Sequence, residues 1–339
     1  MPLRAKSSTS AFPFLFLEHI EKGVHVMNET AFRQPELEET VHTLNVVSTT
    51  PHRGAPYSHL ASQYQADADA SDAVRIELIK KGVVIEHPAY ANAMAYAHWI
   101  LSMPKGTPGR GMLLTGNPGA GKSTFGEELA RINDDKVVVV SAEGSRTMRE
   151  FYGRVLQSLD GPGARPVSTS DREMAVLRIF RALEIKALVV DEIQDLSKGT
   201  DRELNRVLAG IKFLTNTARL PLICMGALES SNAFRNDKHL AQRLRPFLLP
   251  VWKIDQCFAD FIGNLEAMLP LRRPSNLRND AALSFLINCS GGGLRAIMER
   301  IALAGVRAIL SGEECLTLQG LEEAEFAPPV EMLQDLKYA

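Results

Sequence analysis

The sequence has few cysteines, and none of them form a motif. Its 339 residues contain four, Cys224, Cys257, Cys289 and Cys315, and no two make a C-x-x-C pair. This scatter argues against a zinc site and against a disulfide framework. It favours small buried thiols in a reducing compartment, so we expect a cytoplasmic protein.

The chain also lacks a long apolar run and an excess of positive charge. No stretch reaches the roughly 18 apolar residues that a transmembrane helix needs, so no membrane partner is expected. The formal net charge is −2, so no overall field attracts the protein to nucleic acid. Any binding to DNA must come from a local basic surface.

A glycine-rich stretch, GNPGAGKST, organises the rest of the sequence. It lies between an apolar segment at 111–115 and a segment in which Phe125, Leu129 and Ile132 recur at helical spacing. Strand, loop and helix in this order form a P-loop, whose backbone N–H groups and helix N-terminus hold phosphates. Lys122 is predicted to bridge the β and γ phosphates of ATP, and Ser123 to ligate Mg²⁺. The predicted nucleotide-binding residues of this stretch are Gly116, Asn117, Pro118, Gly119, Ala120, Gly121, Lys122, Ser123 and Thr124.

Two acidic residues follow a second buried strand. The segment ALVVDEI places Asp191 and Glu192 after four apolar residues, far enough beyond Lys122 for one intervening strand and its helices. We expect this strand to lie beside the P-loop strand, where Asp191 holds the water shell of Mg²⁺ and Glu192 polarises the attacking water. A carboxylate placed to activate water favours hydrolysis over phosphoryl transfer to a bound acceptor.

Strands and helices alternate over residues 76–252, which predicts an α/β domain with a doubly wound parallel sheet. Further strands are expected at 136–141, 220–226 and 247–252. The pairs Ser170 with Glu173 and Thr200 with Glu203 are predicted to form capping boxes, each at the start of a helix. From Asp255 onward strands are absent, and three helical segments predict a small all-helical lid at 253–312. Residues 1–75 and 313–339 are expected to form a flexible N-terminal region and a tail.

Arginines complete the predicted site. Arg243 and Arg245 precede the last strand, where a P-loop ATPase with a helical lid presents an arginine finger to its neighbour's γ-phosphate. Arg243 is the predicted finger, and a pair of solvated arginines is the alternative. Arg295 begins a lid helix after a glycine turn, so it is predicted to couple the phosphates to the position of the lid.

These segments together resemble the AAA+ ATPases, and specifically the TniB family of transposition regulators, which is related to the TnsC-type target-selection ATPases. The resemblance covers roughly Ile79 to Ser311 and rests on LLTGNPGAGKST, ALVVDEIQDLSKG, RELNRVLAGIKFLTN, LAQRLRPFLLPVW and above all LPLRRPSNL. The first two segments are common to many ATPases, whereas the last two occur together in a much narrower group of proteins. The implied roles are Walker A for Lys122 and Ser123, Walker B for Asp191 and Glu192, finger for Arg243 and lid sensor for Arg295.

The resemblance implies an ATP-dependent homo-oligomer or filament on duplex DNA, which recruits a DDE-type transposase and helps to choose the insertion site. Contact with DNA would be largely independent of base sequence. The candidate contacts are Arg146, Arg149 and Arg154, and a plain solvated helix face is the alternative for each. Such ATPases usually have a polar residue after the fourth strand, but here Ala227 follows Gly226, so slow hydrolysis is expected.

Two other functions are compatible with the P-loop. A helicase-loader-like AAA+ adaptor would remodel a protein partner and touch DNA little. A small-molecule kinase would need an acceptor-binding lid and no finger from a neighbour, and the lid helices offer no acceptor cluster. Assembly on naked duplex DNA that depends on ATP distinguishes the transposition regulator from the adaptor.

Overall fold

The structure is a computed structural model, and it describes residues 57–82, 87–107, 110–159, 168–234 and 237–324. The predicted N-terminal region up to residue 56 and the tail from residue 325 lie outside the described residues. The strands are β1 Gly111–Gly116, β2 Val137–Ser141, β3 Ala187–Asp191, β4 Leu222–Gly226 and β5 Arg245–Leu249. The α-helices are α1 Asp72–Lys81, α2 Pro88–Ser102, α3 Lys122–Arg131, α4 Met148–Ser158, α5 Thr169–Ala182, α6 Asp201–Ala218, α7 Lys238–Ala241, α8 Gln256–Glu266, α9 Asp280–Ser290, α10 Leu294–Ser311 and α11 Leu318–Glu323.

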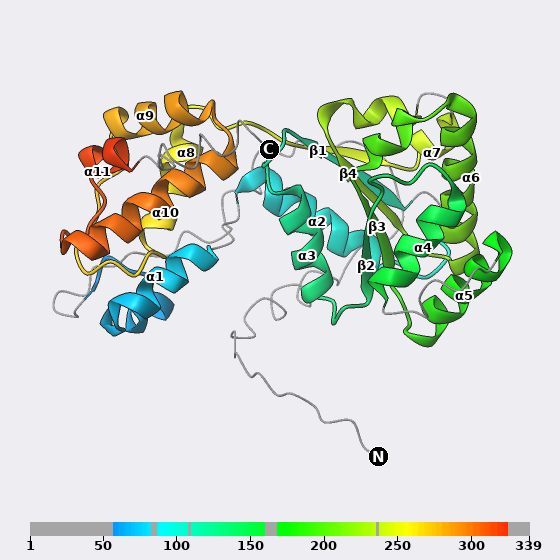
Figure 1. The fold of residues 1–339 in the computed structure, drawn as a ribbon, viewed down its shortest axis with the longest axis horizontal. Helices are drawn as coiled ribbons and strands as arrows, with labels where there is room; N and C mark the ends of the chain where they lie inside the picture. Colours follow the sequence, from blue (N-terminus) through cyan, green and yellow to red (C-terminus); the bar gives the residue numbers. More distant parts are fainter. Residues whose placement is uncertain (1–56, 83–86, 108–109, 160–167, 235–236, 325–339) are drawn as a thin grey trace, which may run out of the picture. The chain divides into compact units, whose positions relative to one another are not determined.

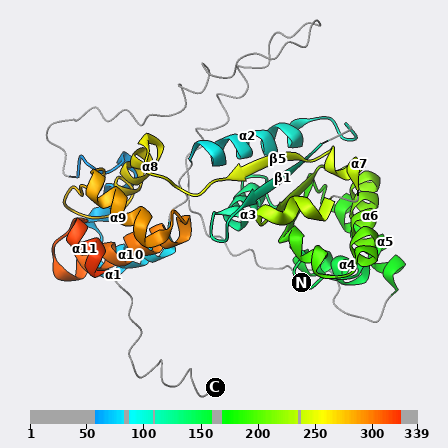
Figure 2. The same ribbon diagram turned by 90° about the horizontal axis from the view of Figure 1, so that it is seen from above.

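The strands of the described residues are all parallel, in the order β2-β3-β4-β1-β5 (Figure 1, with β5 labelled in Figure 2). Successive side chains of a strand point to opposite faces, so alternate residues enter two cores. On one face α2 and α3 cover a core that includes Leu114 and Val189. On the other face α4, α5 and α6 cover a core that includes Leu113 and Val190 (Figures 1 and 2). This three-layer arrangement confirms the predicted α/β fold.

The sheet order corrects one prediction. The strand with the acidic pair, β3, does not lie beside β1, because β4 pairs with both of them. The acids still reach the P-loop edge, since the carboxyl ends of parallel strands gather at one side of the sheet. Adjacency of the two strands is therefore unnecessary for the site.

The helix starts agree with the sequence at one capping box and differ at the other. Thr200 and Glu203 form the predicted box at the start of α6. At α5 the box is formed by Ser168 and Asp171, two residues earlier than predicted. The carboxylate of Glu173 is engaged elsewhere, because it accepts a hydrogen bond from the hydroxyl of Tyr152 at 2.6 Å.

The last strand also begins earlier than the predicted 247–252. β5 starts at Arg245 and contains Pro246, which has no N–H to donate. An edge strand tolerates this loss because one of its sides has no partner strand, and β5 is an edge strand.

The helical domain is larger than the predicted 253–312. Its core contains residues of α8, α9 and α10 together with Ile79 of α1 and Leu321 of α11. Two short 3-10 helices, η3 Ser62–Tyr64 and η4 Ala66–Asp69, precede α1. Residues 57–75 thus contain η3, η4 and the start of α1, so the prediction of flexibility there is wrong, and residues 313–324 belong to the helical domain rather than to a tail.

Candidate functional site

The glycine-rich loop connects the end of β1 to the start of α3. Gly119 and Gly121 have φ angles of 76° and 93°, in the left-handed region that favours glycine. Lys122 is 7% exposed and donates from Nζ to the carbonyl oxygens of Gly116 and Asn117, each at 2.9 Å. The loop therefore wraps around the ammonium group of Lys122.

Two effects shift the pKa of Lys122 in opposite directions. Burial lowers the pKa of Lys122, while the carboxylates of Glu192 and Asp191 act in the opposite direction. The structure thus brings the acidic pair close enough to the lysine to influence its charge.

Asp191 joins the two motifs directly. The hydroxyl of Ser123 donates to Asp191 Oδ2 at 2.8 Å, and Asp191 Oδ1 accepts from the backbone N–H of Glu192 at 2.8 Å. Asp191 ends β3 and is 8% exposed. A hydroxyl and a carboxylate side by side supply the oxygen ligands that Mg²⁺ prefers. Together with the loop N–H groups and the Lys122 ammonium, these residues fit a nucleoside triphosphate with Mg²⁺.

Glu192 is held by a residue that sequence reasoning missed. Its backbone is left-handed, with φ of 53°, and its carboxylate accepts a hydrogen bond from Gln194 Nε2. Gln194 Oε1 accepts from the N–H of Ala227 and from the hydroxyl of Ser230, both at 3.0 Å. The sequence contains one indication of this role. Ala227 has no polar side chain to contact the site, so another residue has to make that contact.

The start of α10 contacts the P-loop. The backbone N–H of Arg295 donates to the carbonyl of Gly119 at 3.2 Å. A Cβ atom added at Gly119 would lie 2.8 Å from Arg295 Cβ, so the loop needs glycine there. The structure therefore brings Arg295, whose side chain is exposed, beside the predicted phosphate site.

Arg243 and Arg245 lie at the opposite end of the sheet. Arg245 is paired with Met112 near the start of β1, whereas the P-loop follows the end of that strand. Arg243 donates to Asn216 Oδ1 at 3.0 Å, and the Arg245 guanidinium lies 5.2 Å from the ring centre of Tyr96. Neither arginine joins the nucleotide site of its own chain, so a finger role is open only toward another subunit.

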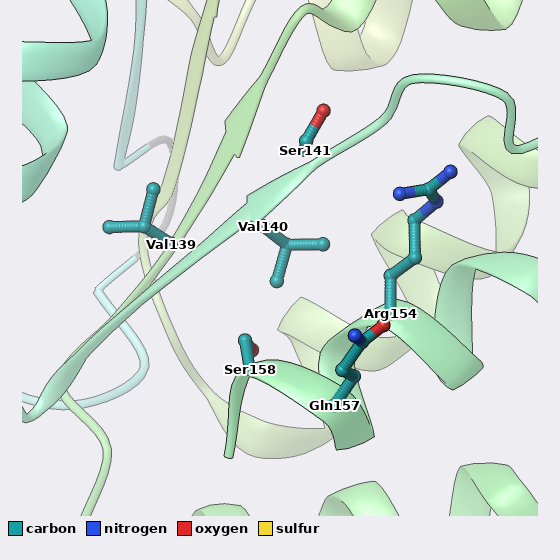
Figure 3. Close-up of a pocket in the computed structure, with 6 residues that line it drawn as sticks. All are labelled: Val139, Val140, Ser141, Arg154, Gln157 and Ser158. Carbon is teal, nitrogen blue, oxygen red and sulfur yellow. The ribbon is translucent and has the colours of Figure 1, made fainter. Parts of the chain in front are cut away.

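The three candidate DNA contacts do not share one face. Arg146 precedes α4 and Arg149 lies in its first turn, and both are exposed. Arg154 follows Arg149 by about 140° of helix rotation. Arg154 lines a groove of about 290 Å³ between α4 and the edge strand β2, with Val139, Val140, Ser141, Gln157 and Ser158 (Figure 3).

Among solved structures, the chain is similar to two archaeal proteins. The ORC2 protein of Aeropyrum pernix, solved as ADPNP–ADP complexes, has 14% identity and a TM-score of 0.54, over 73% of this chain and 70% of that one. Cdc6p from Pyrobaculum aerophilum has 16% identity and a TM-score of 0.55, over 78% and 74%. At such identities the similarity shows the fold alone, which is the α/β P-loop fold of AAA+ ATPases.

No curated protein gives a significant match to the sequence. In the described part of the chain, no helix has the length and apolar character to cross a membrane.

The family comparison gives the clearest result. The sequence profile described as Bacterial TniB protein matches residues 75–254, which is more than half of the 339 residues. The match includes both nucleotide motifs and the segment with Arg243. The chain therefore belongs to the TniB family.

Proposed function

We propose that this TniB protein hydrolyses ATP to ADP and phosphate, assembles on duplex DNA and regulates transposition by recruiting or activating a DDE-type transposase. The observation that carries the proposal is the 2.8 Å contact between Ser123 and Asp191, which joins the P-loop to the acidic strand end beside Lys122. This combination supports nucleotide hydrolysis, and membership of the TniB family supports the role in transposition.

In the proposed reaction each residue has a separate role. Lys122 binds the β and γ phosphates, and Ser123 and Asp191 hold Mg²⁺, the latter through water. When bound, Mg²⁺ neutralises charge on the phosphates. Glu192 orients the attacking water and accepts its proton. The start of α10 contacts the P-loop, so Arg295 is suited to couple the state of the phosphates to the helical domain.

The proposed active unit is a homo-oligomer or filament. Arg243 lies at the sheet end opposite the P-loop, so it serves as a finger for the next subunit rather than for its own. A head-to-tail contact of this kind forms a ring or a filament, depending on the rotation from one subunit to the next. Slow turnover would keep this assembly intact while ATP lasts.

The proposed DNA contacts are Arg146, Arg149 and Arg154. They would bind phosphates without reading bases, so affinity should fall steeply with salt. The four cysteines are free thiols, which suits a reducing cytoplasm, where we place the reaction.

The test is fluorescence anisotropy of a labelled random-sequence duplex, measured with and without ATP and Mg²⁺. We expect binding that requires ATP and is lost in Lys122→Ala. A matched control is Lys186→Ala, which changes a lysine before β3 and away from the P-loop. Absence of binding at low salt with ATP would contradict the proposal, and ATP hydrolysis stimulated by a protein partner instead would favour the adaptor function.

A further inference from the structure

The side chain of Gln194 has a single chemically consistent orientation. Ala227 N–H and Ser230 O–H both donate to the same atom of the Gln194 amide at 3.0 Å, so that atom must be the carbonyl oxygen. The opposite end is then the NH₂ group, which faces a carboxylate acceptor on Glu192. Reversing the amide would set donor against donor on one side and acceptor against acceptor on the other.

The residues around this amide leave it little freedom. Ser230 is fully buried. A Cβ atom added at Gly226 would lie 2.2 Å from Gln194 Oε1 and 2.2 Å from Ser230 Oγ, so only glycine at the end of β4 admits the amide. Gln194 is therefore fixed between the end of β4 and the carboxylate of Glu192.

We propose that Gln194 is a positioning residue for Glu192 and supplies, from the turn η5 (Ile193–Lys198), the polar group that is missing at Ala227. Its NH₂ group holds Oε2 of the carboxylate and leaves Oε1 to accept from the attacking water. Through its carbonyl oxygen it ties that carboxylate to the end of β4. The inference rests on the proposed ATPase function, in which Glu192 activates water.

The first test is the ATPase activity of Gln194→Ala. We expect kcat to fall about 10- to 100-fold, because an unpositioned base loses most of its effect, while KM for ATP stays within about threefold. Gln319→Ala is the matched control, since Gln319 also donates its amide to a glutamate, Glu323, at 2.7 Å on the exposed surface of α11. That variant should retain the wild-type kcat.

The second test is the pH profile of Gln194→Glu. A glutamate can accept from Ala227 and Ser230 as glutamine does, but it can donate to Glu192 only when protonated. Two adjacent carboxylates share a proton at low pH and repel each other once both are ionised. We therefore expect kcat of this variant, relative to wild type, to fall as the pH rises from 6 to 9. A merely structural role for Gln194 would not produce this profile.

The outcomes separate the inference from the function on which it rests. If Glu192→Gln abolishes hydrolysis but Gln194→Ala keeps kcat within twofold, the positioning role is wrong and the ATPase function stands. If Glu192→Gln hydrolyses ATP at the wild-type rate, both are wrong. Should Gln194→Ala fail to fold by circular dichroism, the Gln194→Glu profile decides, and a profile parallel to wild type overturns the inference.

Discussion

At the scale of single residues, the buried charge of Arg75 stands out because it lies outside the nucleotide site. Its guanidinium is fully buried and donates to both carboxylate oxygens of Glu314, at 2.6 and 2.7 Å. It also donates to Asp72 and to the carbonyl of Pro270. Arg272, from the segment LPLRRPSNL, contacts the same Glu314. The most distinctive segment of the sequence therefore contributes to a structural ion cluster.

Replacing Glu314 with glutamine should destabilise the protein by about 3 kcal/mol near neutral pH, because the buried Arg75 keeps only the exposed Asp72 as a counter-charge. The hydrogen bond from Arg75 lowers the pKa of Glu314 below its ordinary 4.5. A group with a depressed pKa contributes stability above its unfolded-state pKa and loses it as the pH falls through the folded-state value. Urea unfolding of the wild type and of Glu314→Gln should thus show a difference in the free energy of unfolding at pH 7, and this difference should disappear toward pH 3. A difference independent of pH would contradict this.

The nucleotide site shows which residues a sequence can reveal. Lys122, Ser123, Asp191 and Glu192 belong to motifs with fixed local spacing, and the structure brings them together at the P-loop edge. Gln194 has no such spacing, since its partners Ala227 and Ser230 come from β4 and the turn after it. Only the folded chain brings them together.

At the scale of elements, the start of α5 offers a direct comparison of two serines. Ser168 accepts from the backbone N–H of Asp171 at 3.1 Å, whereas Ser170 lies exposed inside the first turn. Ser168→Ala should lower the free energy of unfolding by about 1 kcal/mol, and Ser170→Ala should leave it nearly unchanged. Thermal unfolding monitored by circular dichroism would measure both. Equal effects, or a larger one at Ser170, would place the helix start where the sequence pattern predicts it.

The sheet illustrates why local sequence patterns predict strands and helices but not the order of the strands in the sheet. Apolar runs such as the one at 137–141 identify the strands, and capping residues identify most helix starts. The position of β4 between β3 and β1 follows from pairing between segments far apart in the sequence. No local periodicity encodes that pairing, so the predicted adjacency of β3 and β1 was wrong.

At the scale of the whole molecule, the finger role of Arg243 predicts complementation between two inactive variants. Glu192→Gln retains the finger and the phosphate-binding Lys122 but lacks the catalytic base, and Arg243→Ala has the reverse defect. Each alone should lose most DNA-dependent ATPase activity, about 10³-fold or more for the finger. Mixing them should restore part of it, because mixed neighbours then combine an intact site with an intact finger.

The control for that mixture is Arg245→Ala, which removes a guanidinium that stacks on Tyr96 and Phe247. It should lower stability but keep ATPase activity without a partner variant. If the mixture of Glu192→Gln and Arg243→Ala stays as inactive as its components, while both still assemble, Arg243 does not act between subunits.

The helical domain combines segments that precede and follow the nucleotide domain in the sequence. Its helix α1 packs with α10, whereas the next helix, α2, packs on the sheet. Arg75 and Glu314 are 239 positions apart. At roughly 5 to 20 residues per second, a ribosome needs on the order of 10 to 50 s to deliver the second after the first. During that interval all strands of the sheet are synthesised, while Arg75 of α1 still lacks its partner Glu314. We therefore expect the nucleotide domain to fold before the helical domain during synthesis.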